Sequence, residues 1–303
     1  MQKEFYSNGK LLLSGEYAIL DGALGLAVPT KYGQSLKVTS TSSAGLLEWT
    51  SFDEKGKVWF SGSLNLDGLT LISSTDNAIS RTLITLLSEA KSKNPSFLQN
   101  IGGLKVETHL DFPRLWGLGS SSTLINNIAQ WAQVDAFQLL KNAFGGSGYD
   151  IACAQHDNPI FYQLENGAPK IEEVSFNPSF KDAIYFVYLN QKQSSKTAIA
   201  TYREQEFNKE SLLEDISEIT KKMATSSSLS TFESLLLEHE KILSKVLGLE
   251  TIKSKLFPDY SGSIKSLGAW GGDFIMATGD QKTPGYFKSK GFETVISFSE
   301  LVL

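Results

Sequence analysis

The chain has 303 residues, 41% of them hydrophobic, and a net charge of −5, which fits a globular protein of one large or two ordinary domains. The negative charge argues against nucleic acid as the main partner, because backbone binding needs a basic face. The single cysteine, Cys153, excludes an internal disulfide and a cysteine-based zinc site, and its apolar neighbours favour a buried side chain over a nucleophile. With no leader and no apolar run long enough to cross a membrane, we expect a cytoplasmic protein without a membrane partner.

Strand-like and helix-like hydrophobic patterns follow one another along the chain. Strands and turns are expected over 4–50 and 57–66, a helix over 75–93 with Thr75 as N-cap, a strand over 103–110, helices over 124–134 and 137–144, a strand over 184–189, helices over 211–223 and 231–247, and a last strand over 294–298. The helix over 231–247 carries His239 on its apolar face, which favours a core histidine over a metal ligand. The mixture of strands and helices predicts an α+β protein.

A segment rich in glycine and serine stands directly before the helix expected at 124–134. It reads Gly117, Leu118, Gly119, Ser120, Ser121 and Ser122. A helix start offers unpaired backbone N–H groups and a positive dipole end, and glycines let the backbone approach a ligand, so the segment predicts an anion site suited to phosphate. The alternative is a flexible turn with a serine N-cap. The spacing is that of neither a Walker A loop nor the dinucleotide fingerprint.

Two further glycine-containing motifs lie far from this loop in the sequence. One begins at Gly9-Lys10 and continues to Gly15-Glu16-Tyr17, and the other spans residues 265–273 and reads Lys-Ser-Leu-Gly-Ala-Trp-Gly-Gly-Asp. In this order, the three motifs resemble those of the GHMP kinase superfamily. Within it they are most similar to the motifs of mevalonate and phosphomevalonate kinases, as is the segment Gly148-Tyr149-Asp150-Ile151-Ala152.

The resemblance covers almost the whole chain and implies a two-domain α+β fold. Residues 1–180 would form an ATP-binding domain similar to domain 2 of ribosomal protein S5. Residues 181–303 would form a ferredoxin-like domain, with the active site in the cleft between the two.

The resemblance also implies an activity. The chain would be an ATP-dependent kinase that transfers the γ-phosphoryl group to a small metabolite, with mevalonate or phosphomevalonate as the expected acceptor and ATP and Mg²⁺ as cofactors. Lys10 matches the motif-one lysine that touches phosphate, and Asp150 matches the aspartate that acts on the acceptor as a general base or an orienting group.

The remaining site residues are assigned by the same resemblance. Nucleotide phosphates would be wrapped by Gly117, Leu118, Gly119, Ser120, Ser121 and Ser122, with Ser121 reaching Mg²⁺ through ATP. Acceptor binding would fall to Glu16, Tyr17, Gly271, Gly272 and Asp273. From its residue type alone, Glu16 is equally consistent with binding the acceptor and with pairing to a nearby cation.

The sequence departs from the family pattern at several places, of which two bear on the site. The acidic magnesium ligand found in mevalonate kinase is missing, since Gln138 stands near its position. Either Asp135 replaces it, or metal binding is weak, or Ser121, Asp150 and the nucleotide alone hold the ion. Trp270 replaces a small residue, where it would crowd the acceptor or stack on it. These departures keep open a non-catalytic homologue that binds nucleotide or metabolite. The resemblance itself leaves a second enzyme open, a diphosphomevalonate decarboxylase of the same superfamily. The oligomeric state also stays open, a homodimer included.

Overall fold

The protein is described here by a computed structural model that covers residues 2–99, 102–191 and 195–303. Its chain divides into two compact units. The first unit comprises Met1–Gly9, Tyr32–Arg114 and Leu118–Gln155, and the second comprises Lys10–Lys31, Leu115–Gly117 and His156–Leu303. Residues 10–31 and 156–180 therefore group with the C-terminal part of the chain in this division, and a domain boundary at residue 180 stays a prediction.

The first unit contains a mixed β-sheet. Its strands are β3 (Leu46–Phe52), β4 (Val58–Asn65), β5 (Thr70–Ser74), β6 (Gly103–Leu110) and the C-terminal half of β2 (Gly25–Thr41). They pair in the order β5-β4-β3-β6-β2, with β3 and β6 parallel and the other pairs antiparallel. The long strand β1 (Gln2–Ser14) also pairs with β2.

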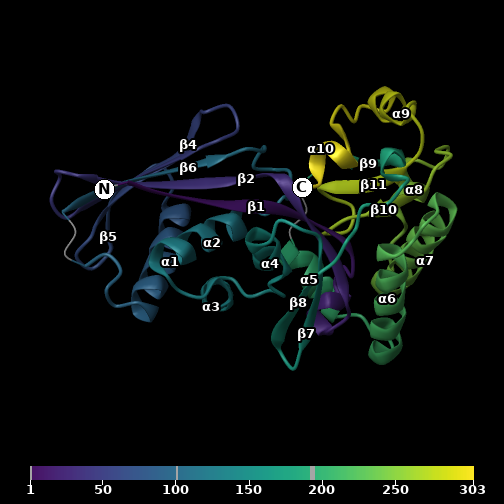
Figure 1. Ribbon diagram of the computed structural model, residues 1–303, viewed down its shortest axis with the longest axis horizontal. Helices are drawn as coiled ribbons and strands as arrows, with labels where there is room; N and C mark the ends of the chain where they lie inside the picture. The colour runs from purple at the N-terminus through teal and green to yellow at the C-terminus, as the bar shows by residue number, and fades with distance from the viewer. Residues whose placement is uncertain (1, 100–101, 192–194) are drawn as a thin grey trace. The chain divides into compact units, whose positions relative to one another are not determined.

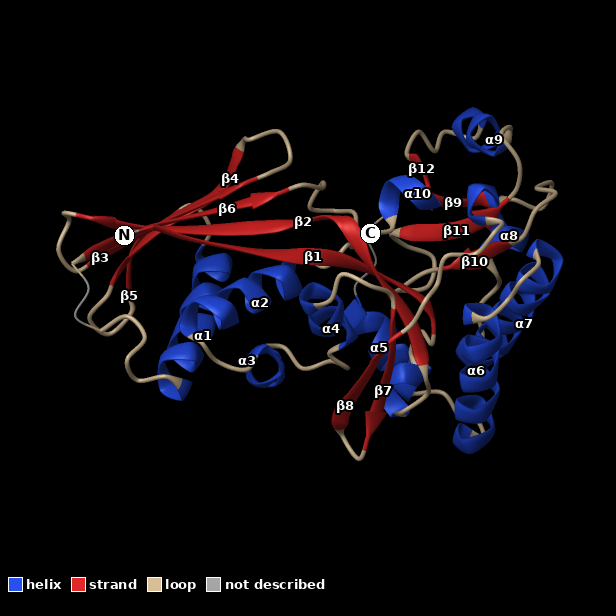
Figure 2. Ribbon diagram, viewed as in Figure 1, coloured by secondary structure: helices blue, strands red, loops and turns tan. Residues whose placement is uncertain are grey.

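Helices cover one face of this sheet (Figures 1 and 2). They are α1 (Asn77–Lys93), α2 (Ser120–Ala132), α3 (Ala136–Ala143) and α4 (Tyr149–Gln155). Apolar side chains of both layers form one core, to which Trp49 and Val106 contribute from strands and Leu87 and Ile128 from helices. Burial of such side chains is the main stabilising term for the unit.

The N-terminus of α1 differs from the expectation by one residue. Its N-cap is Asp76, whose side chain accepts hydrogen bonds from the amides of Ala78 and Ile79, and not Thr75. The hydroxyl of Thr75 is instead bonded to the backbone of Ser61 on β4. A cross-strand contact of this kind leaves no trace in the local sequence.

The second unit contains a four-stranded antiparallel sheet in the order β10-β11-β9-β12. The strands are β9 (Ile184–Tyr188), β10 (Ile264–Ser266), β11 (Phe274–Thr278) and β12 (Val295–Ser297). Helices stand between β9 and β10, and α9 (Thr283–Ser289) stands between β11 and β12. This strand order and the helical crossovers agree with the ferredoxin-like arrangement that the resemblance implies.

Further elements complete the second unit. The N-terminal part of β2 pairs with β7 (Ile160–Glu165), which pairs with β8 (Ala168–Glu173). The helices are α5 (Ser195–Arg203), α6 (Lys209–Ala224), α7 (Leu229–Leu247), α8 (Ile252–Leu256) and α10 (Phe298–Leu301), with short 3₁₀ turns at Ala18–Asp21 and Lys181–Ala183. Helices α6 and α7 lie side by side (Figure 1).

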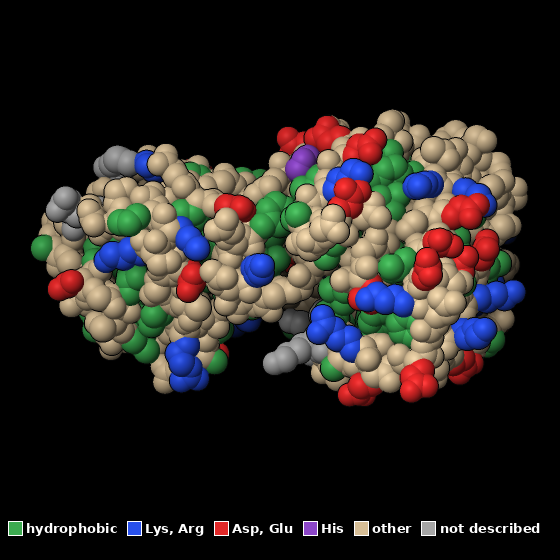
Figure 3. All heavy atoms as spheres, turned by 90° about the horizontal axis from the view of Figure 1, so that it is seen from below, with side chains coloured by type: hydrophobic (Ala, Val, Ile, Leu, Met, Phe, Trp, Pro, Cys, Tyr) green, Lys and Arg blue, Asp and Glu red, His purple; other side chains and the backbone are tan. Residues whose placement is uncertain are grey.

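Two side chains with reactive chemistry are buried, as the sequence predicts. Cys153 on α4 and His239 on α7 have no exposed surface. On the face shown in Figure 3, acidic and basic side chains are interspersed. Among the described residues, no helix has the length and apolar character needed to cross a membrane.

Candidate active site

The glycine loop leads into α2 as the sequence predicts, but the helix begins earlier, at Ser120. Gly117 and Gly119 have positive φ angles of 68° and 93°, a conformation that glycine adopts at little cost. Gly119 is the N-cap, so no side chain caps α2, whereas Asp76, Asp135, Asn208 and Ser228 cap the helices α1, α3, α6 and α7. The first amides of α2 are therefore left to bind an anion or water.

The hydroxyl groups of this loop divide into two kinds. Ser122 is 2% exposed and donates to the carbonyl of Gly119 at 2.8 Å, so its side chain braces the loop. Thr123 is buried and donates to Oε1 of Gln34 at 2.7 Å. Ser121 is exposed. Its hydroxyl is therefore accessible from solvent, and its predicted contact with Mg²⁺ stays a prediction.

Three motifs that are distant in the sequence meet at Gly117. The ammonium of Lys10 on β1 donates to the carbonyl of Gly117 at 2.8 Å. A Cβ atom added to Gly117 would collide with the carboxylate of Asp273, so only glycine allows the loop to approach motif three this closely. The structure thus brings together the predicted residues Lys10, Gly117 and Asp273.

Motif three comprises the last two residues of β10 and the loop that leads from it to β11. Gly268, Gly271 and Asp273 all have positive φ angles, of 68°, 79° and 50°. The backbone of Asp273 is fixed on both sides, because its N–H donates to Gln191 O and its carbonyl accepts from Leu189 N, each at 2.8 Å. The predicted residues Gly271 and Gly272 lie in this loop.

Glu16 is almost fully buried, at 2% exposure, and pairs with a lysine of motif three. Its Oε1 accepts a hydrogen bond from Nζ of Lys265 at 2.5 Å. Burial raises the pKa of Glu16, and the Lys265 charge offsets part of that rise. Of the two readings left open by the sequence, the structure favours pairing with a cation over contact with an acceptor.

Two more buried ionisable groups from α7 surround this ion pair. His239 accepts a hydrogen bond at Nε2 from the amide of Gly15, at 3.2 Å, and burial lowers its pKa well below the usual range, so the ring is neutral with its proton on Nδ1. Glu240 accepts from the amide of Ser266 at 2.9 Å, and burial raises its pKa to about 8. The sequence analysis missed the roles of Lys265 and Glu240. For Glu240 a signal was present, since its helical spacing places it with Leu236 and Leu243 on the apolar face of α7.

Tyr17 and Trp270 contact each other through a hydrogen bond instead of flanking an open site. The hydroxyl of Tyr17 accepts from the backbone N–H of Trp270 at 2.7 Å. The indole Nε1 of Trp270 donates to Glu250 O at 3.1 Å, and the side chain is 9% exposed. The indole packs in a buried cluster, whereas the sequence analysis expected it to crowd the acceptor or stack on it.

Asp150 lies in the first turn of α4, in the first unit. That helix is tied to α2, because Asn126 donates to Ala154 O at 3.2 Å and accepts from Gln155 at 3.0 Å. Asp135 is engaged at the start of α3, where its carboxylate accepts from Phe137 N at 2.8 Å. Among the residues that the structure describes, no three His, Cys, Asp or Glu side chains form a metal-binding group.

The predicted site residues therefore fall into two groups. Lys10, Glu16, Tyr17, Gly117 and motif three belong to the second unit, whereas Leu118–Ser122 and Asp150 belong to the first. The peptide bond between Gly117 and Leu118 joins the groups.

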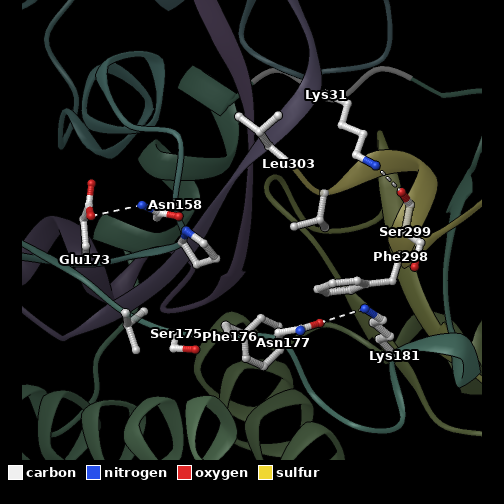
Figure 4. A pocket seen from close by; sticks show the side chains of 13 residues that line it. Lys31, Asn158, Glu173, Ser175, Phe176, Asn177, Lys181, Phe298, Ser299 and Leu303 are labelled. Carbon is white, nitrogen blue, oxygen red and sulfur yellow. Dashed lines mark hydrogen bonds between the residues drawn. The ribbon is translucent and has the colours of Figure 1, made fainter.

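The second unit also holds a cavity of about 630 Å³ that no described residue of the three motifs lines. Figure 4 shows Lys31 and Lys181 at its edge, bonded to Ser299 O at 2.6 Å and to Asn177 Oδ1 at 2.9 Å. Phe176 and Phe298 supply apolar lining. This cavity is therefore separate from the residues of the three motifs.

Solved structures share the fold of this chain over nearly its full length. The mevalonate kinase of Methanococcus jannaschii has a TM-score of 0.69 at 15% identity, covering 97% of this chain and 96% of its own. The phosphomevalonate kinase of Streptococcus pneumoniae, in complex with phosphomevalonate and AMPPNP, has 0.71 at 15% identity, covering 97% and 99%. A mevalonate diphosphate decarboxylase from Legionella pneumophila has 0.58 at 12% identity, covering 98% and 100%.

No protein-family model and no curated protein sequence matches the chain. The likeness to solved structures shows the fold: the chain has the α+β fold of the GHMP kinase superfamily. The similar structures given above are those of a mevalonate kinase, a phosphomevalonate kinase and a mevalonate diphosphate decarboxylase.

Proposed function

We propose that this protein is an ATP-dependent kinase that phosphorylates a small metabolite. The observation that carries the proposal is the convergence at Gly117, where Lys10 of motif one and Asp273 of motif three meet the glycine loop. Phosphoryl transfer depends chiefly on positioning and on neutralising charge. A cation, a glycine turn and an uncapped helix start supply both.

The residues of the glycine loop and Lys10 have the chemistry that a nucleoside triphosphate needs. The first amides of α2 lack a side-chain cap and would donate to phosphate oxygens, and Lys10 would neutralise part of their charge. The exposed hydroxyl of Ser121 suits Mg²⁺, which keeps several waters and takes only one or two protein ligands beside phosphates. Bound there, the ion would offset charge on the transferred group.

Asp150 would act on the acceptor. If the acceptor group is a hydroxyl, its proton passes to the Asp150 carboxylate as the oxygen attacks the γ-phosphorus and the bond to ADP breaks. If the acceptor group is already a phosphate, no base is required. In that case Asp150 orients the acceptor, and Lys10 carries more of the catalytic effect.

The proposed acceptor is mevalonate or phosphomevalonate. Two observations support this choice, namely the motif resemblance of the sequence and the similar structures, one of which is complexed with phosphomevalonate and AMPPNP. The decarboxylase that shares the fold supports a second candidate, ATP-dependent decarboxylation of diphosphomevalonate.

A non-catalytic binding protein is the third candidate. Two departures from the family pattern suggested this candidate, namely the absent acidic magnesium ligand and Trp270. The burial of the indole removes the second reason, whereas the engagement of Asp135 as a helix cap leaves the first in place.

An acceptor panel with two readouts tests the proposal. Purified protein with ATP and Mg²⁺ is given mevalonate, phosphomevalonate, diphosphomevalonate, homoserine or galactose, and release of ADP and of carbon dioxide is measured. We expect ADP release with mevalonate or phosphomevalonate and none when Mg²⁺ is chelated.

Each other outcome has a definite meaning. Carbon dioxide release from diphosphomevalonate would show that the activity is decarboxylation and would refute the kinase proposal. ADP release with homoserine or galactose alone would keep the kinase and change the acceptor. No turnover of any acceptor at millimolar concentration would refute the enzymatic proposal.

A further inference from the structure

The turn Gly15–Glu16–Tyr17 has a strained backbone. Tyr17 has φ 61° and ψ −51°, and the amide of Ala18 donates to Glu16 O at 2.7 Å, which closes a γ-turn around Tyr17. A γ-turn with positive φ at its centre is rare and strained, above all with a bulky residue there. Such a conformation persists only where the surrounding contacts determine it, and it commonly marks functional sites.

Contacts from α7 and motif three hold each residue of this turn. The amide of Gly15 donates to His239, the carboxylate of Glu16 accepts from Lys265, and the hydroxyl of Tyr17 accepts from the amide of Trp270. All of these groups are buried, so the bonds are shielded from water and costly to leave unmade.

Trp270 fixes the motif-three loop from the other side. Its indole N–H donates to Glu250 O, and its ring packs in a cluster with Tyr17, Tyr202 and Leu247. Three residues further on, Asp273 is bonded through its backbone to Gln191 and Leu189 and lies against Gly117. The loop between Trp270 and Asp273 is thus held at both ends.

We propose that Tyr17 and Trp270 are positioning residues, which anchor the motif-three loop and thereby fix Asp273 against the glycine loop. This proposal deepens the proposed kinase function and rests on it for its effect on turnover. The hydroxyl of Tyr17 then serves the loop and not the acceptor. Trp270, which occupies a position where a small residue is usual, supplies an anchor through its indole.

A pair of Tyr→Phe variants isolates the anchor. Tyr17→Phe removes the hydroxyl that accepts from Trp270 N and keeps the ring stacked on Tyr202 at 5.6 Å. Tyr202→Phe makes the same chemical change in the same cluster, but its hydroxyl bonds to Asp21 and does not touch motif three. Amide hydrogen exchange of residues 267–273 is measured by mass spectrometry in both variants.

In Tyr17→Phe we expect exchange in this loop to be about tenfold faster or more, because a buried N–H loses its acceptor. Exchange in Tyr202→Phe should match the parent. For turnover, Tyr17→Phe should lower kcat about tenfold at near-normal AMPPNP affinity, since the glycine loop itself is unchanged. Trp270→Phe, which keeps a ring but loses the bond to Glu250, should speed exchange in the same segment and serves if Tyr17→Phe does not fold.

The outcomes separate this proposal from the proposed function. Unchanged exchange in Tyr17→Phe, or an equal rise in Tyr202→Phe, overturns the anchor. Faster exchange in Tyr17→Phe with unchanged kcat shows that the loop is anchored but refutes the positioning role. Faster exchange in Tyr17→Phe, combined with no activity of the parent toward any acceptor, would support the anchoring of the loop and refute the proposed kinase function.

Discussion

At the scale of single residues, burial assigns roles that residue type leaves open. Ser121 and Ser122 are neighbours of the same kind, yet one hydroxyl is exposed and the other is bonded to Gly119 O. Glu16 and Glu240 are acidic residues in apolar surroundings, and each is held by a donor from the segment that contains Lys265 and Ser266. The predictions at this scale are substitutions that keep shape and change one group.

Glu240→Gln should change how stability depends on pH. The pKa of Glu240 is about 8 in the folded chain against an ordinary value of 4.5, so between these values the folded state retains a proton that the unfolded state releases. Stability from this group is complete below pH 4.5 and is lost as pH rises to about 8. Glutamine does not titrate, so the variant does not lose this stability. Its free energy of unfolding relative to that of the parent should therefore rise by up to about 1.4 kcal/mol for each pH unit of increase between pH 4.5 and pH 8.

Denaturant unfolding from pH 5 to pH 9 measures this difference. The exposed Glu238 on the same helix provides the control Glu238→Gln, for which we expect no such trend. A constant difference between Glu240→Gln and the parent over the whole range would contradict the assigned pKa.

Ser121→Ala and Ser122→Ala should have opposite consequences. Ser121→Ala removes an exposed hydroxyl, so we expect a higher Mg²⁺ requirement and near-normal stability. Ser122→Ala removes a buried hydrogen bond, so we expect a loss of about 1 kcal/mol in stability with little change in the Mg²⁺ requirement. Urea unfolding and a magnesium titration of ADP release check both, and equal behaviour of the two variants would refute the division.

Asp150→Asn should lower kcat about 100-fold if the acceptor is a hydroxyl, because a general base is lost, while AMPPNP affinity stays near normal. Asp135→Asn is its control, since asparagine caps a helix as well as aspartate does. A normal rate for Asp150→Asn indicates a phosphate acceptor or a wrong assignment. A raised Mg²⁺ requirement for Asp135→Asn would support the alternative in which Asp135 is the metal ligand.

At the scale of elements, the glycine loop depends on how closely motif three approaches it. Gly117→Ala would force a Cβ against the Asp273 carboxylate in addition to straining a residue at φ 68°. Gly145→Ala imposes similar strain, at φ 72°, with no atom within 4 Å of the added Cβ. The difference between the variants isolates the close approach.

We expect Gly117→Ala to weaken AMPPNP binding at least tenfold, because the loop must shift away from Asp273, while Gly145→Ala only lowers stability by about 1–2 kcal/mol. Calorimetry and thermal unfolding measure these quantities. Equal nucleotide affinity in both variants would show that the loop tolerates the displacement.

The elements also show how much the sequence reveals. Helices α1, α6 and α7 and strand β6 follow from hydrophobic periodicity, since each has one apolar face and a long pattern. The short helix α4 and the hairpin β7–β8 were not predicted. Segments of this length carry too few periodic positions, and tertiary contacts determine them.

At the scale of the whole molecule, the motifs predicted the fold, and partners distant in sequence decided what each residue does. Lys10 and Gly117 were assigned to one site from the sequence, and the structure joins them by a hydrogen bond. The partners of Glu16 and of the Trp270 indole could not be predicted. Lys265 is 249 positions from Glu16, and local pattern carries no information about such pairing.

The central claim is that the glycine loop and Lys10 bind a nucleotide polyphosphate. Calorimetric titration of AMPPNP with Mg²⁺ into the parent protein, Lys10→Met and Lys3→Met tests it most directly, since Lys3 is an exposed lysine on the same strand, β1. We predict saturable 1:1 binding by the parent and Lys3→Met, and at least tenfold weaker binding by Lys10→Met, because a charge-assisted contact is lost. No binding by the parent, or equal binding by Lys10→Met, would contradict the claim.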